Sequence, residues 1–217
     1  MTLPPHLVGE VVETCKALIE RLNDLKTLAQ YDRQLHQYAR DYFTGKADDT
    51  EFLDKMISAI GEQINRAWNE GMRSNGLDPL ADKTDEMRSR IDELIRNEQD
   101  HVTGLADMIN QTRERGGDIT PINARVDMWA RRYTDVVNQA KLETAEGKQL
   151  LEWIYGDTEH CETCAALNGT VQTADEWAKG KYHPQQPPNE DLDCGGWRCK
   201  CQLKKTKKKK TGLPTGM

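Results

Sequence analysis

The placement of the cysteines constrains the fold of this chain most strongly. Five of its six cysteines lie between positions 161 and 201, near the C-terminal end. Cys161 and Cys164 have the spacing C-x2-C, a turn in which two thiolates can bind one metal ion. Cys194, Cys199 and Cys201 follow about thirty residues later and can complete a tetrahedral site. The sequence therefore predicts a structural zinc site with these five candidate ligands, since four soft ligands favour Zn²⁺ over Mg²⁺ or Ca²⁺.

The choice of ligands and the state of the thiols stay open at this point. In an extended "RCKCQL" segment, Cys199 and Cys201 point to the same face, so both can bind the metal, or one can bind while the other packs. His160 and His183 are reserve ligands. Disulfide pairs, which are uncommon in a reducing cytoplasm, and free buried thiols are the alternatives to metal binding.

The composition predicts a thin or elongated core. Only 36% of the 217 residues are hydrophobic, 30% are charged, and Phe occurs twice. No apolar run approaches the ~20 residues that cross a bilayer, and the first residues, "MTLPPHLVGE", lack the basic and apolar regions of a secretory signal. We therefore expect a soluble protein with no membrane contact, made in a reducing cytoplasm.

Amphipathic periodicity predicts a mainly α-helical region over residues 1–148. The first apolar seam follows Pro4 and Pro5 and alternates steps of three and four residues: Val8, Val11, Cys15, Leu18, Leu22, Leu25 and Ala29. A second helix carries Leu35, Tyr38 and Tyr42. A third helix, capped by Asp49 or Thr50, places five apolar residues on one face: Leu53, Ile57, Ile60, Ile64 and Trp68.

Two further helices complete this region. One runs from about Thr84 to Arg115 and aligns Met87, Ile91, Leu94, Val102, Leu105 and Ile109. Pro121 lies near the first turn of the next helix, whose inward residues are Ile122, Val126, Trp129, Tyr133, Val136 and Ala140. Narrow seams on long helices predict an elongated bundle, in which the seams form the core or contact other subunits.

The sequence pattern changes after residue 148. "LLEWIYG", residues 150–156, is short and rich in aromatic and branched residues, as is typical of a buried strand. The segment 157–203 is rich in Gly, Pro, Asn and Asp and has too few aliphatic side chains to fold without a staple. We therefore predict a small β-rich, zinc-stapled domain over residues 149–203, followed by a basic flexible tail over residues 204–217.

The charge of the chain is strongly asymmetric. Residues 198–210 contain eight basic and no acidic side chains, so the rest of a chain with a net charge of −6 carries −14. Such a tail is either a solvated terminus or a contact for an acidic protein surface or for DNA phosphates, which it would bind without reading the base sequence.

The motifs of the C-terminal part also resemble a known family. "LEWIYGDTEHCETCAALNGTV", a spacer with "HPQQPP", and "LDCGGWRCKCQL" are similar to the C-terminal module of the minor head or head-morphogenesis proteins of tailed bacteriophages. The resemblance covers residues 153–203, about a quarter of the chain. It implies that Cys161, Cys164, Cys199 and Cys201 occupy the matching cysteine positions and that residues 167–169 form a turn between strands. Many members have a His-Pro pair where this chain has Cys194 and two glycines.

The resemblance implies a non-catalytic virion protein, assembled in the host cytoplasm and located at or near the portal and the inner head. Its expected partners are other phage head proteins (capsid or portal), further copies of itself, and DNA through the basic tail. We expect no enzyme activity, because the supply of thiols is ample and no H-E-x-x-H motif accompanies them. The alternatives are a zinc-ribbon nucleic-acid-binding protein with a helical oligomerisation arm, and an enzyme that uses zinc-bound water with Glu159 or His160.

Overall fold

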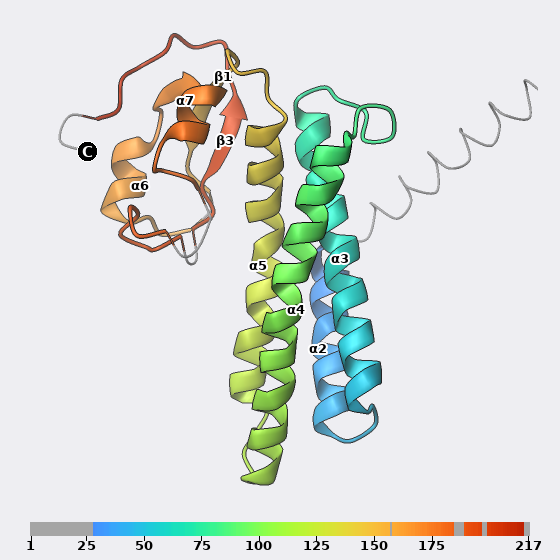
Figure 1. The fold of residues 1–217 in the computed structure, drawn as a ribbon. Coiled ribbons are helices and arrows are strands. Elements are labelled where there is room, and N and C mark those ends of the chain that lie inside the picture. Colours follow the sequence, from blue (N-terminus) through green and yellow to red (C-terminus); the bar gives the residue numbers. More distant parts are fainter. Residues whose placement is uncertain (1–27, 157, 185–188, 197–198, 215–217) are drawn as a thin grey trace, which may run out of the picture.

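Figure 1 shows an elongated bundle of helices with a small module beside one end of it. The structure is a computed structural model that describes residues 28–156, 158–184, 189–196 and 199–214. Within this part of the chain, the bundle consists of α2 (Leu28–Phe43), α3 (Asp49–Ser74), α4 (Asp85–Glu114) and α5 (Thr120–Glu143). The seam expected from Val8 to Leu25, including Cys15, lies outside the described residues.

Local sequence signals determine where these helices begin. The Asp48 side chain caps α3 by accepting a hydrogen bond from Glu51 N, and Thr84 caps α4 through Met87 N. The prediction of a cap at Asp49 or Thr50 is wrong by one or two residues, because Asp48 is the residue that keeps an extended backbone (φ −88°, ψ 176°). The fourth expected helix agrees with α4 to within a residue at each end.

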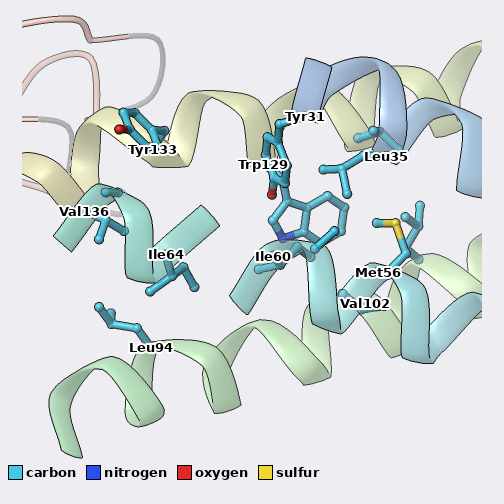
Figure 2. Close-up of a cluster of buried hydrophobic side chains, with 14 of the residues drawn as sticks. Tyr31, Leu35, Met56, Ile60, Ile64, Leu94, Val102, Trp129, Tyr133 and Val136 are labelled. Atoms are coloured by element: carbon cyan, nitrogen blue, oxygen red, sulfur yellow. The ribbon is translucent and has the colours of Figure 1, made fainter. Parts of the chain in front are cut away.

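The apolar seams of the four helices pack on one another in one core, as Figure 2 shows for residues of α2, α3, α4 and α5. Every residue predicted to face inward on α5 is buried. On α3, Ile60, Ile64 and Trp68 are buried as predicted. In the first half of this helix, however, Phe52 and Met56 are buried while Leu53 and Ile57 are only partly buried. Adjacent apolar residues at these positions fit two helical registers, and packing against the other helices decides between them. No helix of the described chain is both long and apolar enough to cross a membrane.

A polar network is buried between α4 and α5. Both Glu98 carboxylate oxygens accept hydrogen bonds at 2.9 Å, one from Trp129 Nε1 and the other from Arg132 Nε. Arg132 Nη1 also donates to Asp135 Oδ2 at 2.6 Å. Two carboxyl groups therefore share one guanidinium in a site where Glu98 and Asp135 are only 5% and 3% exposed. Burial makes this network expensive unless every charge in it is compensated.

The C-terminal module is a three-stranded antiparallel sheet with two short helices. Its elements are β1 (Leu150–Ile154), α6 (Glu162–Leu167), β2 (Val171–Thr173), α7 (Ala174–Lys179) and β3 (Gln202–Lys205), and the strand order is β2-β1-β3. Trp153 of β1 and Trp177 of α7 pack in its core with their rings 5.8 Å apart. Trp177 Nε1 donates to Leu151 O at 3.0 Å, which fixes α7 against β1. The expected strand at residues 150–156 is confirmed for Leu150–Ile154.

The module packs against the C-terminal half of α5. Asn138 Nδ2 donates to Cys201 O at 3.2 Å, and Leu142 belongs to the core of the module rather than to that of the bundle. Asn75, which ends α3, donates to Lys141 O at 2.7 Å and accepts from Gln149 Nε2 at 3.1 Å. The last turns of α5 therefore carry side chains of both cores, and they hold the cysteine-bearing segments at a defined place on the bundle.

The expected boundary between module and tail, at residue 204, falls inside β3, which pairs with β1 through Lys205. Beyond β3, Thr211 N donates to Val171 O and Thr211 Oγ1 accepts from Val171 N, both at 2.9 Å. Lys208 forms an ion pair with Glu152, and Lys210 with Glu176. Residues 202–211 thus lie along the module, where they form backbone hydrogen bonds with the sheet and ion pairs with acidic side chains.

Substituting Asp135 with Asn tests the buried network through its dependence on pH. Burial raises the pKa of Asp135 to about 7, while Arg132 opposes and Glu98 adds to this rise. Because the unfolded pKa is about 3.9, the folded chain keeps a proton that the unfolded chain releases, and the free energy of unfolding falls as the pH rises from about 4 to about 7. Asparagine does not titrate, so the variant does not lose this contribution as the pH rises. The free energy of unfolding of Asp135→Asn should therefore rise relative to that of wild type by about 1–4 kcal/mol over that range.

Urea unfolding at several pH values measures this difference directly. The matched control is Asp92→Asn, which changes an exposed carboxylate of α4 and should give a curve parallel to wild type. A parallel curve for Asp135→Asn as well would show that the buried carboxyl titrates as it does in the unfolded chain.

Candidate metal centre

The C-x2-C motif lies at the start of α6. Cys161 is the residue that caps this helix, and its Sγ accepts a hydrogen bond from Cys164 N at 3.4 Å. This turn places Cys164 one helical turn further on, where its side chain is 1% exposed and packs in the core of the module. The cap geometry brings both thiols to the same side of the chain, as the spacing predicts.

The second motif leads directly into β3. Cys201 N donates to Cys199 Sγ at 3.4 Å, so the amide of one cysteine points at the sulfur of the other, as in the first motif. Cys201 is buried and Cys199 is partly buried. Cys164 Sγ and Cys199 Sγ lie 3.8 Å apart, although the two residues are 35 positions apart in the sequence. The fold therefore joins the two motifs through this contact.

The five candidate thiols form two trios that share Cys164. One trio consists of Cys161, Cys164 and Cys194 and the other of Cys164, Cys199 and Cys201, and within each trio the sulfurs lie within 4.8 Å of one another. All five are free thiols, and the 3.8 Å between Cys164 and Cys199 exceeds the S–S bond length of about 2.05 Å. These cysteine clusters can hold a metal ion.

The two reserve histidines behave differently. His160 Nδ1 lies 3.7 Å from Cys201 Sγ, and its ring stacks on Tyr155 with centroids 3.8 Å apart. His160 is therefore within reach of the second trio. His183 is held elsewhere, since its Nε2 contacts Trp177 O at 3.0 Å. The order of the sequence does not distinguish these two histidines, because the difference depends on how the loops fold back on the sheet.

The thiols interact electrostatically as well as by proximity. Hydrogen bonds from the thiols of Cys164 and Cys199 lower the pKa of Cys201 to about 3, although burial opposes this shift. Burial alone would raise the pKa of Cys161, but hydrogen bonds from Cys164 and Cys194 outweigh it and lower the pKa. Hydrogen bonds to Cys199 and Cys201 and burial raise the pKa of Cys164. Thiols whose ionised form is favoured thus lie beside a thiol whose protonated form is favoured, an arrangement in which a bound cation can replace the retained proton.

A contact that the sequence analysis did not anticipate links α6 to the loop that carries Cys194. Asp193 Oδ2 accepts hydrogen bonds from Thr163 N at 2.9 Å and from Thr163 Oγ1 at 2.6 Å, and Asp193 N donates to Thr163 Oγ1 at 3.2 Å. The Thr163 hydroxyl and amide lower the pKa of Asp193, which stabilises its charged form. Thr163 precedes Cys164 and Asp193 precedes Cys194, so the contact aligns the first trio without using any sulfur.

Comparisons with known proteins do not identify the chain: no family model, no curated protein and no solved structure matches it.

Cys164 belongs to both trios and Cys194 to only one, so serine substitutions at these two positions should weaken metal binding to different extents. Cys164→Ser removes a ligand from both trios, whereas Cys194→Ser leaves the second trio intact with His160 beside it. With Co²⁺ as the probe, we expect Cys164→Ser to weaken binding at least tenfold more than Cys194→Ser, a difference of at least about 1.4 kcal/mol. Thiolate-to-cobalt absorption during a titration of the full chain measures both affinities. Equal losses for the two variants would contradict the shared role of Cys164.

Proposed function

We propose that the cysteine cluster binds one structural Zn²⁺ ion. The donor chemistry supports this ion, since thiolates are soft ligands that Mg²⁺, Ca²⁺ and Mn²⁺ do not prefer. The distance also fits, because a tetrahedron with Zn–S bonds of about 2.3 Å has S···S edges of about 3.8 Å, and Cys164 Sγ and Cys199 Sγ lie 3.8 Å apart. We therefore assign Cys164 and Cys199 as the first two ligands.

The remaining positions come from the neighbours of these two sulfurs. Cys161 and Cys201 complete the set that the family resemblance implies. The Cys161 sulfur accepts a hydrogen bond from Cys164 N, and the Cys201 sulfur interacts with the Cys164 thiol. Cys194 then serves as a fifth thiol beside Cys161. When bound, zinc would cross-link the start of α6 to the segment that enters β3. The described cysteines of these two segments are free thiols, so no disulfide joins them.

The module needs such a cross-link because much of it is irregular. Between the end of α7 at Lys179 and the start of β3 at Gln202, the described residues form no helix or strand. Among the described residues of this segment, few apolar side chains are buried, namely Tyr182, Pro184, Leu192 and Cys201. A segment with so little apolar burial does not offset its own loss of conformational entropy. Metal binding can supply the missing free energy, since structural zinc sites contribute directly to folding.

We further propose a structural, non-catalytic role in the head of a tailed bacteriophage. A catalytic zinc keeps one position for water, whereas here five thiols compete for four positions. The resemblance of residues 153–203 to head-morphogenesis proteins supports the virion role, with capsid or portal proteins and further copies of the chain as partners. The elongated bundle supports it too, because long helices offer an extended surface on which such partners can assemble (Figure 1). The observation that carries the proposed zinc site is the convergence of the two cysteine motifs at Cys164.

Genetic complementation of a phage that encodes this chain tests the virion role. The gene is interrupted and the protein is supplied from a plasmid as wild type, Cys164→Ser or the control Asp92→Asn. We expect wild type and the control to restore infectious particles and to be present in purified heads, and Cys164→Ser to lower the yield at least tenfold because its module is not held. Infectious particles that lack the chain at every stage of assembly would contradict the proposal.

The basic segment that begins at the end of β3 supports a contact with DNA as part of this role. Lys208 and Lys210 are exposed and pair with acidic side chains of the module, and the exposed Lys205, Lys207 and Lys209 lie between and beside them. The positive charges of Lys208 and Lys210 are thus partly compensated by Glu152 and Glu176. Lys205, Lys207 and Lys209 form a short row of positive charge that can neutralise phosphates without reading bases.

One triple and one double alanine variant distinguish the two sets of lysines. Replacing Lys205, Lys207 and Lys209 should reduce the slope of log affinity against log salt for duplex DNA by about 2.7, since each phosphate contact contributes about 0.9. Replacing Lys208 and Lys210 is the matched control and should reduce the slope by less than half as much. Affinities from fluorescence anisotropy at several salt concentrations give both slopes. Absence of DNA binding, or equal slopes for all variants, would exclude the DNA contact.

A further inference from the structure

A second group of metal-ligand side chains lies on the bundle, on a different part of the chain from the cysteines. His36 Nε2 lies 2.9 Å from Asp127 Oδ1 and 3.6 Å from Asp32 Oδ1. Asp32 and His36 are four residues apart on α2, so they share one face of that helix, and Asp127 faces them from α5. The three ligand atoms lie within 4.8 Å of one another. From this geometry we propose that α2 and α5 together form a binding site for a divalent transition-metal ion.

A second interaction fixes the imidazole for this purpose. His36 Nδ1 lies 3.1 Å from Asn123 Oδ1, an acceptor from the turn of α5 that precedes Asp127. With its proton on Nδ1, the ring donates to Asn123 and presents the lone pair of Nε2 to the space between the two carboxylates. Histidine ligands of metals are typically oriented in this way, by a hydrogen bond from the ring nitrogen that does not bind the ion. The arrangement thus contains an oriented ligand as well as its partners.

The scaffold under this site is rigid. Leu35 is next to His36 on α2, and Ile122 and Val126 flank the α5 residues; all three side chains are fully buried in the bundle core. The helices therefore hold the ligand atoms in place before any ion arrives, which lowers the cost of ordering the site. An ion bound here connects the first described helix of the chain to α5, the helix that carries the cysteine module.

The ligand types indicate which ions the site takes. Two carboxylates and one imidazole form a harder donor set than the thiols, suited to Mn²⁺, Co²⁺ or Zn²⁺ and poorly suited to soft ions. The side chains of His36, Asp32 and Asp127 are 20%, 39% and 47% exposed, so water can fill the remaining positions of a six-coordinate ion. Two carboxylates held this close also repel each other, and a divalent cation between them removes that repulsion.

Mn²⁺ is the probe that separates this site from the cysteine centre, since thiolates do not favour it. The full chain is titrated with Mn²⁺, and the loss of the electron paramagnetic resonance signal of the free hydrated ion reports binding. We expect saturation at one ion per chain, at least tenfold weaker binding for His36→Ala and for Asp127→Asn, and about tenfold weaker binding for Asn123→Ala, which removes only the orienting bond. Mn²⁺ should also raise the melting temperature of wild type but not of His36→Ala.

Two controls make the result specific. His101→Ala removes an exposed histidine of α4 and should bind Mn²⁺ as wild type does. Cys164→Ser should also keep Mn²⁺ binding, whatever its effect on the cysteine centre. The proposal is overturned if wild type shows no saturable uptake, if His36→Ala and Asp127→Asn both bind as tightly as wild type, or if binding is lost in Cys164→Ser instead.

Discussion

The sulfur atoms around Cys164 lie where two distant segments of the C-terminal module meet. This residue belongs to both trios of thiols, and through it α6 meets the segment that enters β3. The tryptophan core and the Asp193–Thr163 contact shape the module around this point. In the part of it that the structure describes, the long irregular segment before β3 buries few apolar side chains and so adds little to the core of the module. In the proposed account, zinc is the interaction that converts the proximity of these thiols into a stable link.

The bundle holds the C-terminal module at a defined place. Asn138 and Leu142 of α5 contact the module, and Asn75 at the end of α3 binds both α5 and the start of the module. Direct contacts therefore couple the cysteine-bearing module to the C-terminal end of the bundle. This coupling suits a protein whose proposed work is architectural: the helices present a long surface, and the module presents a charged one at a fixed position beside it.

The sequence predicted the features that depend on local periodicity and failed where tertiary packing decides. Pro121 and the seam on α5, and the limits of α4, follow from spacing and capping residues alone, and the structure agrees. On α3, Phe52 and Leu53 are both apolar, so periodicity could not select the buried one. The C-x2-C spacing predicted that Cys161 and Cys164 meet, but the division into two trios, the separation of His183 from the thiols and the Asp193–Thr163 contact depend on how distant loops fold together.

Amide hydrogen exchange of the full chain, with and without a strong chelator, tests the central claim most directly. The account predicts that removing the metal abolishes protection in β1, β2 and β3 while the amides of α3 and α4 keep theirs, because the bundle has its own core. Unchanged protection of the three strands in a sample shown by its mass to be free of metal would contradict it.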